Sequence, residues 1–212
     1  MNIDVSQKPG RRGLLAITVD EDDWGVVHTS IFGQKPSFPA VVGSLEEWEE
    51  LFSALEYKQT KNYVLKRLAE KPFHTGELAK CLRERLVSQK AIARVTEECL
   101  QAGYLNDAEW VDAFIRGHLR RRHSMQTIAR KLQAKGVPKD DIQEAIQQRK
   151  DPETEKESIR YLLTTRYRSR NLTDRRDKEK VIAALMRKGF SLQNILTEIK
   201  LLNSETKADW QD

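Results

Sequence analysis

A run of basic side chains between residues 116 and 135 has the clearest chemical capability in this sequence. No acidic residue interrupts the run. Its members are Arg116, Arg120, Arg121, Arg122, Arg130, Lys131 and Lys135. Surface helices usually mix charge signs, because opposite charges three or four residues apart stabilise a helix and like charges destabilise it. The run therefore favours a binding surface for an anionic partner over an ordinary solvated helix face.

A second basic stretch, residues 160–176, has six arginines against the single acidic residue Asp174. Tyr161 and Tyr167 lie among these arginines. Arginine and tyrosine together suit both the phosphates and the bases of a nucleic acid. A flexible loop between helices, kept in solution by its arginines, explains the same composition equally well. Both interpretations stay open for this stretch.

The residue types needed for catalysis or metal binding are not grouped in the sequence. The four histidines are scattered and form no HExxH pair, and no Walker lysine loop or GxGxxG is present. Cys81 and Cys99 each lie in an apolar helical pattern, which is typical of small buried thiols and not of a disulfide or zinc site. We expect a protein that is not an enzyme and has no metal ion or cofactor.

The composition of the 212-residue chain favours a mainly helical fold. Hydrophobic residues make up 39% and charged residues 33%, with only ten glycines and six prolines, whereas an all-β fold needs more turn residues and aromatics. No signal peptide is recognised, and no run approaches the roughly 18 apolar residues of a membrane span. These observations predict a cytoplasmic protein that does not enter a membrane.

The net charge of +5 is unevenly distributed. Residues 1–57 carry four basic and ten acidic side chains, a balance of −6, and residues 58–212 carry 33 and 22, a balance of +11. Such asymmetry predicts an acidic N-terminal region and a basic remainder that binds an anionic surface.

The acidic N-terminal region contains the β-rich part of the sequence. Residues 14–19 and 24–32 predict a β-hairpin, and residues 38–43 predict a short third strand. Ser44 with Glu47 three places later has the spacing of a capping box and predicts the start of a short helix.

From residue 58 onward the sequence predicts about nine helices with clear boundaries. Ser88, Asn106, Ser124 and Ser191 occupy expected N-cap positions, Pro138 an expected first turn, and Asp151 with Pro152 a further expected helix start. Gly103, Gly136 and Gly189 each follow an apolar helical stretch, where a left-handed residue favours glycine.

These helices repeat along the chain. Residues 77–92, 127–142 and 180–195 align by shifts of 50 and 53 residues, so that Leu82, Leu132 and Leu185 coincide, as do Ile92, Ile142 and Ile195. An amphipathic helix precedes each aligned segment, so the repeating unit is three helices in about 50 residues. Tandem three-helix repeats of this kind predict an elongated, curved body. The predicted parts are an N-terminal hairpin with a short helix (1–57), three repeats (58–105, 106–151 and 152–202) and a flexible tail (203–212).

The sequence also resembles a known family. Residues 103–137, "GYLNDAEWVDAFIRGHLRRRHSMQTIARKLQAKGV", resemble the middle repeat of the RecX family, bacterial regulators of the RecA recombinase. Residues 185–195, "LMRKGFSLQNI", resemble that family's closing repeat, and residues 68–82, "LAEKPFHTGELAKCL", its opening repeat. Thr75-Gly76 and Leu86 depart from the family pattern in the opening repeat. The resemblance extends over about residues 58–202.

This resemblance implies a cytoplasmic regulator that binds in the groove of the RecA–single-stranded DNA filament and limits filament growth, ATP hydrolysis and strand exchange. It implies RecA as the protein partner, contact with single-stranded DNA, weak contact with duplex DNA, and a monomer. No catalytic residue is implied. The residues expected to contact the filament or nucleic acid are Arg116, Arg120, Arg121, Arg122, Arg130, Lys131, Lys135, Arg187 and Lys188.

Two other functions fit parts of the sequence. Three-helix units with a basic second helix are also typical of helix-turn-helix proteins, and a stand-alone DNA-binding protein would direct Arg130 and Lys131 toward bases. Charges at the preceding turn favour phosphate contacts instead. The other alternative is a structural adaptor whose basic face is only solvated.

Overall fold

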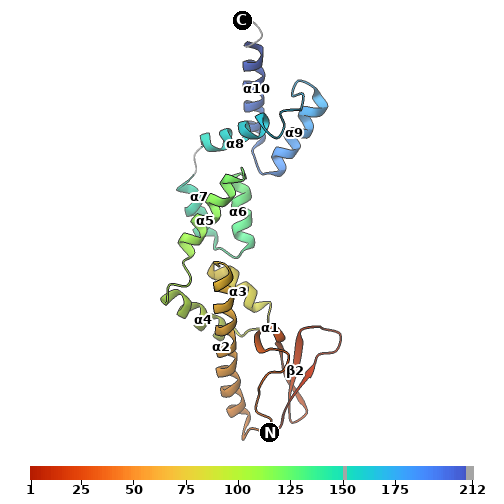
Figure 1. Ribbon diagram of the computed structural model, residues 1–212, viewed down its shortest axis with the longest axis vertical. Helices are drawn as coiled ribbons and strands as arrows, with labels where there is room; N and C mark the ends of the chain where they lie inside the picture. Colours follow the sequence, from red (N-terminus) through yellow and green to blue (C-terminus); the bar gives the residue numbers. More distant parts are fainter. Residues whose placement is uncertain (150–151, 209–212) are drawn as a thin grey trace. The chain divides into compact units, whose positions relative to one another are not determined.

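The computed structural model describes residues 1–149 and 152–208, which belong to two compact units, Met1–Trp110 and Val111–Asp212. The described residues form ten helices and one three-stranded sheet (Figure 1). The mainly helical prediction with a small N-terminal β region is therefore confirmed. The predicted cap at Asp151 and residues 209–212 of the predicted tail lie outside the described residues, and the elongated, curved body stays a prediction.

The sheet of the first unit consists of β1 (Ile3–Gln7), β2 (Leu14–Val19) and β3 (Asp22–His28), antiparallel and in that order. In β2 every second residue is buried, as expected for a strand with one face on a core. Val19 of β2 pairs with Ile3 of β1, and Leu15 of β2 pairs with Val27 of β3. This register directs these apolar side chains to one face of the sheet.

Two details of the predicted β region are wrong. The third strand is β1, whereas residues 38–43 contribute only an isolated bridge between Asn2 and Val41. Pro39 explains this, because its nitrogen has no hydrogen to donate to a ladder. The predicted strand 24–32 also ends early, since residues Thr29–Phe32 form the short helix α1 with His28 as its N-cap.

Helix α2 (Leu45–Glu70) is 26 residues long and replaces two separate helices expected on either side of residue 58. The Ser44 hydroxyl accepts a hydrogen bond from the Glu47 amide, as the capping pattern predicts. The N-terminal half of α2 packs on the sheet through Trp48, which is fully buried, and Phe52. Trp24 contacts both rings edge-on, at centroid distances of 5.2 and 4.7 Å.

The C-terminal half of α2 belongs to the first three-helix repeat, with α3 (Thr75–Arg83) and α4 (Gln89–Gln101). Its core includes Val64, Leu78 and Val95, all fully buried. A carboxylate of α2 also caps α4: Glu56, itself buried, accepts hydrogen bonds from the Ser88 amide at 2.8 Å and the Ser88 hydroxyl at 2.5 Å. The sheet and the first repeat therefore share one helix.

The remaining helices form the second and third repeats. The second has α5 (Asp107–Arg120), α6 (Met125–Ala134) and α7 (Lys139–Gln147), and the third has α8 (Pro152–Thr164), α9 (Arg175–Arg187) and α10 (Leu192–Ala208). Pro138 is the N-cap of α7 and does not lie in its first turn. Helix α10 continues past the predicted end at residue 202, where an ion pair joins Glu205 to Arg160 of α8.

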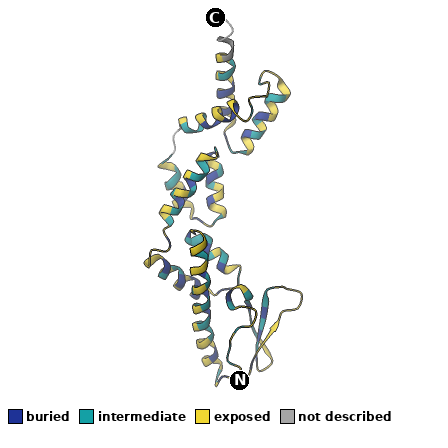
Figure 2. Cartoon of the chain, viewed as in Figure 1, coloured by how far each residue is buried: buried dark blue, intermediate teal, exposed yellow. Residues whose placement is uncertain are grey.

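The burial of the aligned positions confirms the register of the repeats. Leu82, Leu132 and Leu185 are all fully buried. After each of them the chain makes the same turn, in which the amide five residues later donates to the leucine carbonyl at 3.2 to 3.3 Å. Figure 2 shows buried and exposed residues on the same helices, as amphipathic packing requires.

Candidate functional site

The basic run lies on the end of α5, the following turn and α6, all within the second unit. Arg120, Arg121 and Lys131 are exposed, and among residues 1–149 and 152–208 their side chains have no hydrogen bond or ion pair. These three cations are available to a partner without the loss of an internal contact.

Other members of the run have internal contacts. The Arg116 guanidinium pairs with Asp112 one turn earlier in α5, and Asp112 also accepts from Arg149. Arg130 donates to the Gln126 amide oxygen at 3.2 Å. The run is therefore partly neutralised by an acidic residue just outside it, which the sequence-based prediction did not include.

Arg122 is held by an aromatic ring. Its guanidinium carbon lies 4.5 Å from the centroid of the Tyr161 ring on α8, a distance typical of a cation–π contact. Tyr161 is 49% exposed, so the face of this ring is not part of a buried core. Arg122 also has a φ of +55°, a left-handed conformation that ends α5 sharply.

A junction between α6 and α9 places two further predicted residues beside the run. The hydroxyls of Ser124 and Thr127 both donate to the Lys188 carbonyl, at 2.9 and 2.8 Å. Gly189 follows with a φ of +86° and leaves no room for a side chain, because an added Cβ would lie 2.4 Å from each hydroxyl oxygen. The junction therefore brings Arg187 and Lys188 to the N-terminus of α6.

Two histidines meet at the centre of this basic region. The Nδ1 atoms of His118 and His123 are 2.8 Å apart, and the rings stack with centroids 4.9 Å apart. Burial lowers the pKa of both imidazoles below their ordinary value, and the charges of Lys131 and Arg121 lower them further. Lys135 adds to this effect on the pKa of His118, and Lys188 to that on the pKa of His123.

The nine residues predicted to contact the filament thus differ in their surroundings and internal partners. Lys131, Arg121, Lys135 and Lys188 gather around the histidine pair. Arg116 and Arg130 have partners on their own helices. The histidines look scattered in the sequence, and their pairing was not predicted. Their five-residue spacing across a helix end was the available signal, because a left-handed turn brings those two positions together.

The second basic stretch is a weaker candidate because much of it is ion-paired. Arg160 pairs with Glu205, Arg170 with Asp177, and Arg175 with Glu179. These contacts lie within the third repeat, where they join neighbouring helices or stabilise α9 itself. The stretch is neither purely a loop nor a continuous free cationic surface.

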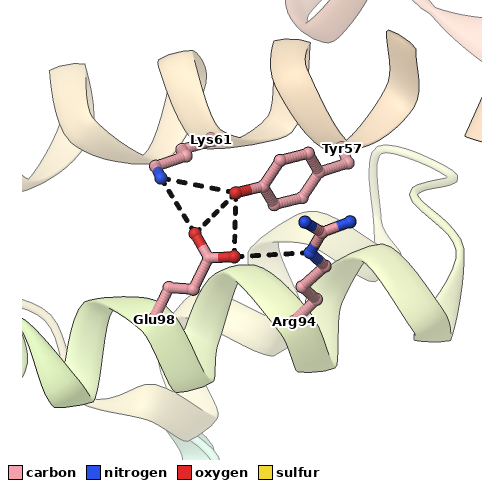
Figure 3. Close-up of polar contacts among 4 residues, drawn as sticks. All are labelled: Tyr57, Lys61, Arg94 and Glu98. Carbon is pink, nitrogen blue, oxygen red and sulfur yellow. Dashed lines mark hydrogen bonds and ion pairs between the residues drawn. The ribbon is translucent and has the colours of Figure 1, made fainter. Parts of the chain in front are cut away.

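In the first unit a polar cluster joins α2 to α4 (Figure 3). The Glu98 carboxylate accepts from the Tyr57 hydroxyl at 2.6 Å and from the Lys61 ammonium at 2.9 Å. Arg94 donates to the same carboxylate at 3.3 Å, and its guanidinium lies 3.8 Å from the centroid of the Tyr57 ring. These contacts join α2 to α4 and stabilise the helix pair.

Within the described part of the chain, no group of three or more His, Cys, Asp or Glu side chains could hold a metal ion. Both cysteines are free, with Cys99 buried and Cys81 partly exposed. No helix of residues 1–149 and 152–208 is both long and apolar enough to cross a membrane.

Comparison with known protein families assigns the two repeats of the second unit. Residues 106–146 match the family model described as "RecX, second three-helix domain", and residues 153–196 match "RecX, third three-helix domain". These ranges contain the basic run, the histidine pair and the α6–α9 junction. The chain belongs to the RecX family.

Proteins named "Regulatory protein RecX" extend the similarity beyond these repeats. The protein of Lactobacillus gasseri is 24% identical over 200 residues, which cover 94% of this chain and 73% of that protein. The protein of Caldanaerobacter subterraneus subsp. tengcongensis is 24% identical over 156 residues, covering 74% of this chain and 77% of that protein. This chain is therefore a member of a family of regulatory proteins.

A solved structure also resembles this chain in fold. The crystal structure of a RecX regulatory protein matches with a TM-score of 0.57 and 21% identity, over 91% of this chain and 96% of the other. RecX from Lactobacillus salivarius matches with a TM-score of 0.58 over 71% of this chain and 98% of the other, also at 21% identity. Identity at this level supports the fold alone.

Proposed function

We propose that this chain regulates the RecA recombinase by binding in the groove of the RecA–single-stranded DNA filament. Binding there limits filament growth, and with it ATP hydrolysis and strand exchange. Membership in the RecX family supports this function. The observation that carries it is the set of exposed cations without internal partners on α5, its turn and α6: Arg120, Arg121 and Lys131.

The physical basis is electrostatic. A nucleoprotein filament presents many phosphates, and each phosphate that a cation neutralises releases condensed counterions, so binding weakens steeply as salt rises. Cations that already have a partner contribute less, because binding must first break the existing pair. We therefore rank Arg120, Arg121 and Lys131 above Arg116 and Arg130 as filament contacts.

The proposed organisation follows from the repeats. We propose that segments 58–105, 106–151 and 152–202 act as successive contact units, and that the monomer binds adjacent RecA protomers. The protein's cations contact DNA through its phosphates, and this contact is secondary to the contact with RecA. The acidic N-terminal region takes no part in the DNA contact, because like charges repel.

The test is RecA ATP hydrolysis on single-stranded DNA with substoichiometric amounts of this protein. We expect inhibition by the wild type and a large loss of inhibition when Arg120, Arg121 and Lys131 are all changed to Glu. The matched control changes Lys8, Arg11 and Lys35 to Glu, which are exposed cations of the acidic N-terminal region without described side-chain partners. Both variants change the net charge equally. An unchanged hydrolysis rate with the wild type at several salt concentrations would falsify the proposal.

A stand-alone DNA-binding protein is the second candidate. Helix α6 follows α5 after a tight turn and carries Arg130 and Lys131, as a recognition helix would. This candidate predicts tight, sequence-dependent binding to duplex DNA without RecA. Gel-shift experiments with and without RecA separate the two candidates, and we expect duplex binding alone to be weak.

A further inference from the structure

The contact between His118 and His123 is a product of the turn that ends α5. The His123 amide donates to the His118 carbonyl at 3.2 Å, and the Arg122 amide donates to the Leu119 carbonyl at 2.8 Å. With Arg122 left-handed, this is a Schellman motif, in which the side chains at the two ends of the six-residue loop touch. Apolar residues usually make that contact, and here two imidazoles make it.

The hydrogen bond between the rings sets how many protons the pair can hold. The two Nδ1 atoms are 2.8 Å apart, and a hydrogen bond between them needs one N–H and one lone pair. This geometry assigns the two rings opposite tautomers. In the neutral pair the donor ring has a bare Nε2. One proton from solvent can bind there without breaking the bond, whereas a second would place two N–H groups against each other.

Positive charges from three neighbouring segments lie around the pair. Lys131 and Lys135 belong to α6 and its C-terminus, Arg121 to the turn, and Lys188 to the end of α9. The Phe114 ring covers one side of the His118 ring, with the two ring centroids 4.4 Å apart. Two charged groups line a cavity of about 290 Å³ with His123: Arg149, which pairs with Asp112, and Glu155, which accepts from the Ser191 amide at 3.2 Å.

This arrangement opposes a metal ion and favours an anion. Four cations would repel a divalent metal from the imidazoles, although two histidines often bind one. Burial first, and then these neighbouring cations, hold the pKa of both rings below the ordinary value, so the unbound pair is mainly neutral near pH 7. A bound anion would offset those charges and restore the affinity of the pair for a proton.

We propose that the His118–His123 pair is a phosphodiester subsite that takes up one proton from solvent when single-stranded DNA binds. The inference rests on the proposed function, because it assigns a ligand to the same cationic surface. A single strand fits better than an acidic peptide segment, since it brings one fixed charge for every nucleotide and can neutralise several neighbouring cations together. The new proton converts the donor ring to an imidazolium, which adds a cation beside the phosphate.

The first experiment uses the intact wild-type protein and a short oligothymidylate, whose bases and phosphodiesters do not titrate near neutral pH. Calorimetric binding in two buffers of different ionisation enthalpy measures the protons taken up. We expect an uptake that approaches one proton per complex and does not exceed it. By linkage, the dissociation constant should then fall by up to about tenfold per pH unit as the pH is lowered between about 8 and 6.

Variants locate the proton. His118→Gln and His123→Gln should each remove most of the proton uptake, while oligothymidylate binding at pH 8 weakens less than about tenfold, since the lysines and arginines remain. The matched control is His28→Asn in the first unit. The pKa of His28 is also lowered, by burial first and then by Arg85, and Asn can replace it as the N-cap of α1. This variant should take up protons as the wild type does.

Several outcomes overturn the inference. They are wild-type binding without proton uptake, absence of oligothymidylate binding at low salt, and equal proton uptake with polyglutamate. If the Gln variants do not fold, the imidazole NMR signals of the wild type decide: the pair must take up its single proton with a higher pKa in the oligothymidylate complex than without it. Failure of the RecA ATP hydrolysis test with intact proton uptake removes the proposed function alone, and the reverse result removes the subsite alone.

Discussion

Single residues explain how the first unit holds its helices together. The pKa of Glu98 falls from its ordinary value of 4.5 to about 2, mainly because the Tyr57 hydroxyl and then the Lys61 ammonium donate hydrogen bonds to the ionised carboxylate. A group whose pKa is lowered on folding stabilises the folded state above its unfolded pKa and loses that contribution as the pH falls through the folded value.

We therefore expect Glu98→Gln to lower the thermal unfolding temperature at pH 7 and to have little effect at pH 2. The difference between the two proteins should shrink between pH 4.5 and about 2, the interval set by the pKa of Glu98. Thermal unfolding followed by circular dichroism across this range measures it. A difference that does not depend on pH would mean that packing, and not the ionised carboxylate, matters.

Leu86 gives a second prediction for a single residue. It occupies the left-handed position of the turn after α3, with a φ of +59°, where the equivalent turns have Gly136 and Gly189. The left-handed conformation costs a residue with a Cβ roughly 1–2 kcal/mol, which glycine avoids. Glycine gives back part of this stabilisation, because its unfolded chain has more conformational freedom to lose on folding.

Leu86→Gly should raise the free energy of unfolding by about 1 kcal/mol relative to Leu86→Ala, which removes the same side chain but keeps the strain. Urea unfolding of both variants measures the difference. Equal stabilities would show that the backbone at this turn relaxes without cost.

Caps were the residues easiest to predict. Ser88, Ser124 and Asn106 each accept the amide hydrogen bond that their sequence context indicates. Partners distant in sequence could not be predicted in the same way. Nothing near Arg122 indicates Tyr161, 39 positions later, because that contact depends on how two repeats pack.

At the scale of elements, the junction of α6 and α9 has no room for one added carbon atom at Gly189. Ser124 is buried, and its hydroxyl both caps α6 and donates to the end of α9. Gly189 is therefore required for two reasons: its φ of +86° and the absence of space for a Cβ. Gly103 has a similar φ of +72°, but no atom lies within 4 Å of the position that a Cβ would take there.

These two glycines form a matched pair of tests. Gly103→Ala should lower the free energy of unfolding by about 1 kcal/mol, the conformational cost alone. Gly189→Ala should cost a further 1–3 kcal/mol or so, because the added methyl group clashes with the Ser124 and Thr127 hydroxyls. Urea unfolding measures both. Equal losses would contradict a tight junction between α6 and α9.

The order and register of the helices followed from the sequence because each repeat has the same apolar spacing. Strand pairing was harder to predict. The segment 38–43 is more apolar than β1, but Pro39 prevents a regular ladder, and the polar strand Ile3–Gln7 pairs with β2 instead. Most of β1 is exposed, so burial supplied little pattern to recognise.

For the whole molecule, the charge asymmetry and the division of the fold do not coincide. The balance of charge changes near residue 57, yet helix α2 runs through that point without a break. Glu56 and Tyr57, at the predicted boundary, bind Ser88 and Glu98 of the first repeat. We infer that the acidic sheet and the first repeat unfold together.

Native-state hydrogen exchange tests this inference. Amides of β2 and of α4 should open with the same free energy and the same dependence on urea, as expected of one cooperative unit. Amides of α8 in the second unit are the internal control. If β2 opened at a clearly lower free energy than α4, the sheet would be an independent part despite the shared helix.

The continuous α2 also restricts how this part of the protein can change in length. Trp48 faces the sheet and Val64 faces the first repeat on a helix that turns about 100° and rises about 1.5 Å per residue. One residue inserted between them would rotate the sheet through more than a quarter turn relative to α3 and α4. Natural variation in length should therefore fall in the connections 8–13 and 33–43, or come in α2 as steps that restore the helical phase.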